Sequence, residues 1–187
     1  PEITYDAQND EYMIYWATTI PGLYPETQSE KDAGYNHRMY YTITKDFKAF
    51  TKAKVLYEPG FNSIDATIQW DGEKYVMFLK DETREPARKN LKVATAQHLT
   101  GPYSEASAPI TGKYWAEGPT AIQKDGTWLV YFDKYTDHQY GAVQSTDLKN
   151  WTDISDQVSF PDGIRHGTAI QVSTEELKAI QEVFLDK

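Results

Sequence analysis

The chain of 187 residues contains no cysteine. Disulfide bonds and thiolate metal sites are therefore excluded, whatever compartment the protein works in. It also lacks the run of about 18 apolar residues that a membrane-spanning helix requires, and no signal peptide is visible. Because the sequence begins at Pro1 without methionine, we expect a processed chain or a fragment from which an export signal has been removed.

Basic residues are scarce as well: 19 Lys and Arg stand against 28 Asp and Glu, for a net charge of −9. Since binding to phosphate groups requires a basic stripe, nucleic acids and anionic membranes are not expected partners. Aromatic residues reach 14%, with 14 Tyr and 5 Trp, and this excess favours strands. An acidic surface rich in aromatic residues suits the binding of a neutral glycan. The alternative is that the net negative charge serves only to keep the protein in solution.

The chain repeats one pattern about every 50 residues. A polar residue beside small and β-branched residues occurs at Asp65, Glu117 and His166, in steps of 52 and 49 residues. Asp-Gly pairs at 71–72 and 125–126, which favour tight hairpin turns, precede aromatic strands. Four strands per copy at this period are typical of a β-propeller blade. The alternative is a β-sandwich of about twelve strands.

We therefore predict an all-β fold of the β-propeller type that is incomplete in this chain. Propellers need at least about four blades to close, so we expect the missing blades to precede Pro1. The strand that follows the third blade would complete a blade begun there, and a capping box at 173–176 predicts a helix packed on the sheets. The predicted units are blades at about 1–60, 61–112 and 113–163, an inner strand at 164–173, and a helix at 174–185.

Inner strands of a propeller start near one face of the central channel, so Asp65, Glu117 and His166 are expected to share that face. The ends of the second strands, including Trp16, would lie there too. Two acids among aromatic rings suit the binding and acid–base hydrolysis of a sugar. We expect Trp115 to exclude water and raise the pKa of Glu117. Structural roles remain the alternative: an acid that caps a strand, or a core histidine.

Three short motifs in this order resemble glycoside hydrolase family 43, the five-bladed propeller arabinofuranosidases and xylosidases. They are Ser-Ile-Asp-Ala at 63–66, Ala-Glu-Gly-Pro at 116–119 and Arg-His-Gly-Thr at 165–168. Residues 1–6 also resemble the family's Trp-Ala-Pro-Glu segment, beginning after its alanine. The resemblance covers nearly the whole chain. It implies a secreted or periplasmic hydrolase that acts on arabinose- or xylose-containing oligosaccharides and polysaccharides.

The resemblance also implies roles for individual residues in an inverting mechanism. Glu117 matches the general acid, and Asp65 matches the aspartate that tunes the pKa of that acid and orients it. The catalytic base, an aspartate of an earlier blade, lies outside this chain, so we expect the chain by itself to be inactive. The residues expected to bind substrate are Trp16, Trp115, Arg165 and His166.

His166 also matches a family histidine that faces a calcium ion or its waters. Calcium prefers six to eight oxygen ligands, so a single histidine is a weak metal signal; no cofactor is expected to be required, and a structural calcium is allowed. The alternative function is a non-catalytic glycan-binding propeller, which needs no acid at Glu117. A propeller that acts on fructans or another sugar with the same acids also stays open.

Overall fold

A computed structural model describes residues 1–28 and 34–184. The strands of the first sheet are β1 (Glu2–Asp6), β2 (Glu11–Thr18), β3 (Arg38–Thr44) and β4 (Lys54–Tyr57). The second sheet has β5 (Ser63–Trp70), β6 (Tyr75–Asp81) and β7 (Asn90–Ala96). The third has β8 (Glu117–Lys124), β9 (Thr127–Lys134), β10 (Gln139–Ser145) and β11 (Thr152–Asp153). The helical segments are the 3₁₀ turns Pro25–Thr27 and Ser155–Gln157 and the helix α1 (Thr174–Phe184).

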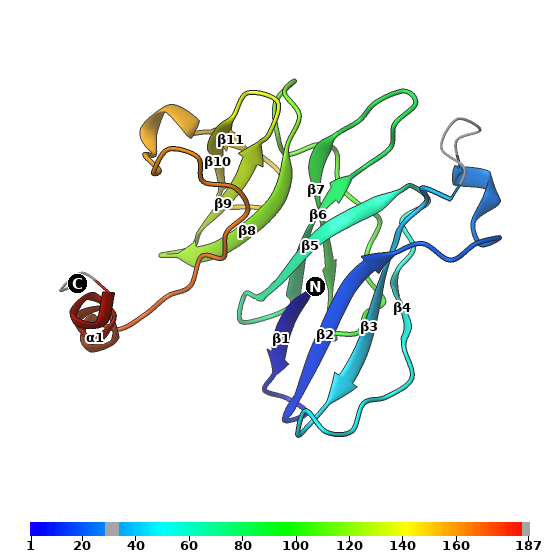
Figure 1. The fold of residues 1–187 in the computed structure, drawn as a ribbon, viewed down its shortest axis with the longest axis horizontal. Coiled ribbons are helices and arrows are strands. Elements are labelled where there is room, and N and C mark those ends of the chain that lie inside the picture. The colour runs from blue at the N-terminus through cyan, green and yellow to red at the C-terminus, as the bar shows by residue number, and fades with distance from the viewer. Residues whose placement is uncertain (29–33, 185–187) are drawn as a thin grey trace.

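The three sheets are antiparallel meanders that lie side by side (Figure 1). Each sheet begins with one strand, β1, β5 or β8, and the following strands are added in sequence order. The first strand of the second sheet, β5, contacts both β2 and β8, so the second sheet lies between the other two. The prediction of an all-β, incomplete propeller is therefore confirmed. None of the helices in the described part of the chain is long and apolar enough to cross a membrane.

Strand β6 explains why the sheets pack as stacked blades. All seven of its residues are buried, because alternate side chains enter two different cores. Met77 and Leu79 pack with the first sheet, whereas Val76 and Phe78 pack with the third. A strand buried on both faces reads as a continuous apolar run rather than as an alternating one.

Ile68 on β5 tests the contact between the first two blades. Its side chain is 2% exposed and lies in the core shared by the first and second sheets. We expect Ile68→Val to lower the free energy of unfolding by about 0.5–1.5 kcal/mol, since it removes one buried methyl group. Urea denaturation measures the change. The same substitution at Ile170, which is 69% exposed, serves as the control, and equal losses for both variants would contradict the packing.

The two Asp-Gly pairs form different turns. Lys124 pairs with Thr127, so residues 125–126 make the predicted two-residue hairpin, with φ of 50° and 77°. The other turn spans four residues, because Trp70 pairs with Tyr75.

The second sheet differs from the predicted four-stranded blade. Residues 104–110 run beside β7 but do not form a regular strand. Their backbone still donates to it at three points: Ser104 to Thr95, Ser107 to Val93, and Ile110 to Leu91, each at 2.8 Å. Intervening bonds go to side chains, such as Val93 N–H to Ser107 Oγ at 3.0 Å. A fourth segment is therefore present, but side-chain oxygens replace part of the ladder.

The predicted inner strand at 164–173 is wrong, because these residues form no strand. Where the segment crosses β8, its backbone bonds to a side chain and not to the strand backbone: Ala169 N–H donates to Thr120 Oγ1 at 2.9 Å. A strand needs a neighbouring backbone to pair with, and no described strand lies on its other side.

The C-terminal helix forms as predicted but does not pack on the sheets. In Figure 1, α1 stands away from all three sheets, and none of its residues is buried. Its apolar side chains at Leu177, Ile180 and Val183 are 45–56% exposed. The capping box is present, with Glu176 N–H donating to Ser173 Oγ at 3.2 Å and Ser173 N–H donating to Glu176 Oε2 at 2.7 Å. The last predicted helical residue, Leu185, lies outside the described residues.

Candidate active site

The site is built on two β-bulges at the starts of β5 and β8. The register of β5 with β6 shifts between Ile64 and Thr67, and that of β8 with β9 shifts between Glu117 and Thr120. Within the bulges Asp65 and Gly118 both have a left-handed backbone, with φ of 51° and 57°. Asp65 is therefore the structural equivalent of Gly118, one residue beyond the place that Glu117 takes in its own repeat.

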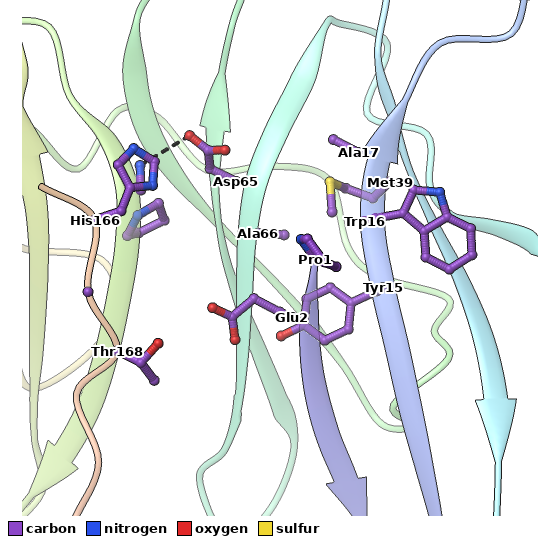
Figure 2. A pocket seen from close by; sticks show the side chains of 13 residues that line it. Pro1, Glu2, Tyr15, Trp16, Ala17, Met39, Asp65, Ala66, His166 and Thr168 are labelled. Atoms are coloured by element: carbon purple, nitrogen blue, oxygen red, sulfur yellow. Dashed lines mark hydrogen bonds between the residues drawn. The ribbon is translucent and has the colours of Figure 1, made fainter. Parts of the chain in front are cut away.

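The bulges nevertheless bring the two acids together, because a bulge re-aims the side chains of its strand. Asp65, Glu117 and His166 each offer one ligand atom within 4.8 Å of the others. Gly118 N–H donates to Asp65 Oδ2 at 3.2 Å, as the dashed line in Figure 2 shows. His166 Nε2 lies 3.3 Å from Glu117 Oε1. Three of the predicted site residues therefore converge at one point.

Gly118 is required for this convergence. A Cβ atom built on it would lie 2.6 Å from His166 Nδ1 and 2.7 Å from Cε1 of the same ring. Its positive φ also favours glycine. The Glu-Gly-Pro motif therefore does two things: it turns the strand and leaves room for the His166 ring beside Glu117.

Glu117 is surrounded by cationic and donor groups. Lys80 Nζ lies 2.9 Å from Oε2, and Arg165 Nη2 lies 3.1 Å from Oε1. Burial pushes the pKa of Glu117 upward, but the hydrogen bond and charge of Lys80, followed by those of His166, outweigh it and hold the pKa below its ordinary value. The expectation of a raised pKa is therefore wrong for this chain.

Trp115 does not act on Glu117 as expected. Its ring is 41% exposed and packs against Tyr135, with ring centroids 5.9 Å apart. It is not among the residues that line the cleft beside the acids. Trp115 was expected at the site because it is close to Glu117 in sequence, but its side chain lies outside the cleft.

The cleft itself has a volume of about 660 Å³. Its walls come from β1, β2, β3, β5, β8 and the segment after the third sheet (Figure 2). Trp16 lines it, with its ring directed away from Asp65 in this view. Arg165 does not line it and instead forms an ion pair with Asp133, besides its contact with Glu117. The lining residues include Pro1, Glu2, Tyr15, Trp16, Met39, Asp65, Pro119, His166 and Thr168.

The pKa of Asp65 is shifted in the opposite direction to that of Glu117. Burial raises its pKa, and the charges of His166 and Lys80 oppose this rise without cancelling it. A group whose folded pKa is raised contributes stability below its unfolded pKa and loses it as the pH rises through the folded value. The ionised Asp65 carboxylate therefore destabilises the fold at neutral pH.

We expect Asp65→Asn to raise the free energy of unfolding at about pH 7 and to change it less at about pH 4. The amide oxygen can still accept the Gly118 N–H, so the bulge keeps its hydrogen bond. Urea denaturation at the two pH values measures the difference. The exposed Asp137→Asn variant should not show this pH dependence, and lower stability of Asp65→Asn at neutral pH would contradict the assignment.

Three residues beside the acids had no predicted role, although Lys80 and Asp133 end second strands and were expected on this face. Lys80 and Asp133 occupy equivalent places at the ends of β6 and β9, as shown by their pairing with Ile64 and Glu117. Both are buried, at 2% and 0% exposure, and a charge at the end of a buried strand was the available sequence signal. Glu2 lines the cleft, and burial raises its pKa.

These residues are a poor match for calcium. Asp65, Glu117 and His166 offer one ligand atom each, whereas calcium takes six to eight oxygens. Both oxygens of Glu117 are already bonded to positively charged side chains, Lys80 and Arg165. No catalytic step is assigned to a metal ion here.

The fold and site define a class: a partial β-propeller whose inner strands bring two carboxylates together, with Asp65 lining a cleft and Glu117 beside it. Comparison with known families agrees. Residues 1–178 match the model of a family described as a probable glycosyl hydrolase domain, related to glycoside hydrolase family 43. The match covers almost the whole chain, which therefore belongs to this family.

Individual relatives are more distant. The chain is 27% identical over 125 residues to an α-L-arabinofuranosidase of Bifidobacterium longum, a stretch that makes up 60% of this chain and 12% of that protein. An exo-β-1,3-galactanase of Phanerochaete chrysosporium, solved with β-1,3-galactotriose, superposes with a TM-score of 0.60 at 12% identity, over 82% of this chain and 34% of that one. The β-xylosidase RS223 superposes with a TM-score of 0.60 at 15% identity, over 81% of this chain and 56% of that one. The chain thus spans about a third to a half of these structures.

Proposed function

We propose that this chain is part of an inverting glycosidase that cleaves arabinose- or xylose-containing oligosaccharides or polysaccharides outside the cytoplasm. The observation that carries the proposal is the convergence of Asp65, which lines the cleft, and Glu117, which lies beside it, in a family 43-related propeller. In the proposed mechanism Glu117 protonates the leaving oxygen, and Asp65 orients that acid and tunes its pKa. Arabinose is supported by the curated relative and xylose by one structural relative.

An inverting reaction also needs a base that activates water on the opposite face of the sugar, about 6.5–9.5 Å from the acid. Asp65 is too close to Glu117 for this role, because the ligand atoms of the two lie within 4.8 Å of one another. As the resemblance to family 43 implies, we infer that the base is supplied from outside residues 1–187. By this proposal, the chain alone binds sugar without turnover.

The test is hydrolysis of nitrophenyl α-L-arabinofuranoside, β-D-xylopyranoside and β-D-galactopyranoside. Each is offered to the 187-residue chain and to a form extended upstream of Pro1. We expect turnover of the arabinoside or the xyloside by the extended form only. Turnover of the galactoside alone would correct the sugar, and turnover by the short chain would show that the base lies within it.

A non-catalytic glycan-binding propeller is the alternative. It is favoured by the lowered pKa of Glu117, which is unusual for a residue that must donate a proton at neutral pH. Calorimetric binding of arabino- and xylo-oligosaccharides by the extended form distinguishes the two. Binding that is accompanied by no hydrolysis of any sugar supports the alternative.

A further inference from the structure

Lys80 is an unusual side chain for the end of a core strand. It is 2% exposed, and its ammonium group lies between two carboxylates. Its Nζ is 2.6 Å from Glu82 Oε2 and 2.9 Å from Glu117 Oε2. The Tyr135 ring covers it, with Nζ 4.7 Å from the ring centroid. A flexible, strongly hydrated group is thereby held in one place without access to bulk water.

Glu82, which binds Lys80, is itself held by further contacts. Glu82 is 5% exposed and also forms an ion pair with Lys89, which is 6% exposed. Tyr35 OH donates to Glu82 Oε1 at 3.0 Å. Charges therefore alternate along the series Glu117, Lys80, Glu82 and Lys89. Buried charges persist only when they are paired in this way.

The two oxygens of Glu117 have different surroundings. Oε2 faces the buried Lys80, whereas Oε1 faces Arg165 and His166, whose side chains are 54% and 50% exposed. Exposed partners can move aside, while the buried one is held by its network. Oε1 is therefore the oxygen that a sugar can reach, and Oε2 is the oxygen by which the carboxyl is fixed.

We propose that Lys80 is a positioning residue for Glu117: it holds Oε2 in the buried network and directs Oε1 into the site. This inference rests on the proposed function of Glu117 as the acid. Glu117 is ionised over a wider pH range when an ammonium group pairs with it. Removing the Lys80 charge should therefore raise the pH at which the Glu117 carboxyl titrates.

The test compares four forms of the protein: wild type, Lys80→Gln, Lys80→Arg and Glu82→Gln. The titration of the Glu117 carboxyl is followed by ¹³C NMR, and its resonance is assigned by its absence from Glu117→Gln. We expect Lys80→Gln to raise the titration midpoint by about one pH unit, since it removes the nearest positive charge. Lys80→Arg keeps the charge and should keep the low midpoint.

Glu82→Gln is the decisive control. It disturbs the same buried network but leaves Lys80 paired with Glu117 alone, so the midpoint should stay low. Equal upward shifts in Lys80→Gln and Glu82→Gln would reduce Lys80 to a structural element and overturn the proposal, as would no shift in either. Lys92→Gln removes a lysine of the neighbouring strand that contacts Asp81, Ser107 and Phe61, and it controls for net charge.

Two further measurements keep the result interpretable. If Lys80→Gln does not fold, the double variant Lys80→Gln/Glu82→Gln removes one charge of each sign, and the same upward shift is expected in it. In the extended, active form, the alkaline limb of the pH–rate profile should move upward with the NMR midpoint. An NMR shift without glycosidase activity would refute the proposed function and leave the pairing of Lys80 with Glu117 standing, whereas activity without either shift would overturn the role of Lys80.

Discussion

Glu117→Gln in the extended form is expected to lose roughly 10²–10⁴-fold in kcat/KM on natural oligosaccharides, the usual contribution of a general acid. The amide keeps the size of the side chain and its oxygen can still face Lys80, but it supplies no proton to the leaving group. The loss should be much smaller on a dinitrophenyl glycoside, whose leaving group departs without protonation. Steady-state hydrolysis of both substrate types measures the difference.

The contrast between leaving groups separates an acid from other roles. Loss of a base or of a sugar contact would slow both substrates to a similar extent, and that outcome would remove Glu117 from the acid role. Glu73→Gln, an exposed glutamate in the β5–β6 turn, is the matched control and should retain full activity. Calorimetry with an oligosaccharide should show that Glu117→Gln still binds.

Gly118→Ala is expected to cost roughly 10²-fold in kcat/KM, although Gly118 supplies no reacting group. The new methyl carbon would lie 2.6 Å from His166 Nδ1, so the ring must move and lose its place beside Glu117. A displacement of about 1 Å at a catalytic constellation has an effect of this size. The left-handed backbone adds a loss of about 1–2 kcal/mol in the free energy of unfolding.

Gly126→Ala separates the two effects of that substitution. Gly126 also has a positive φ, at 77°, but nothing lies within 4 Å of a Cβ built on it. The variant should show a similar loss of stability in urea denaturation and no loss of activity. Equal losses of activity in both variants would mean that backbone strain, and not the His166 ring, explains the effect at Gly118.

Much of the architecture could be predicted from local signals. The 125–126 turn, the aromatic strands and the capping box at Ser173 depend on residues close in sequence, and each forms as predicted. The convergence of Asp65, Glu117 and His166 was also predicted, because a radial repeat brings equivalent positions to one channel. The one-residue offset between Asp65 and Glu117 could not be predicted, since a bulge changes register without leaving a clear mark in the sequence.

The predictions that failed depend on contacts between distant residues. The segment at 164–173 has strand-like residues but no described backbone to pair with, and α1 has an apolar face but no described surface to cover it. The pKa of Glu117 was predicted from its neighbour Trp115, whereas Lys80, 37 residues away in sequence, sets its direction.

The sequence by itself determined the repeat, most of the strands, the family and the convergence of the two carboxylates, because periodicity and short motifs are properties of neighbouring residues. Only the tertiary structure decided the direction in which the pKa of each acid is shifted. The protonation of a carboxyl depends on its burial and on the charges within a few ångströms, and Lys80, Arg165 and His166 reach Glu117 from separate segments of the chain.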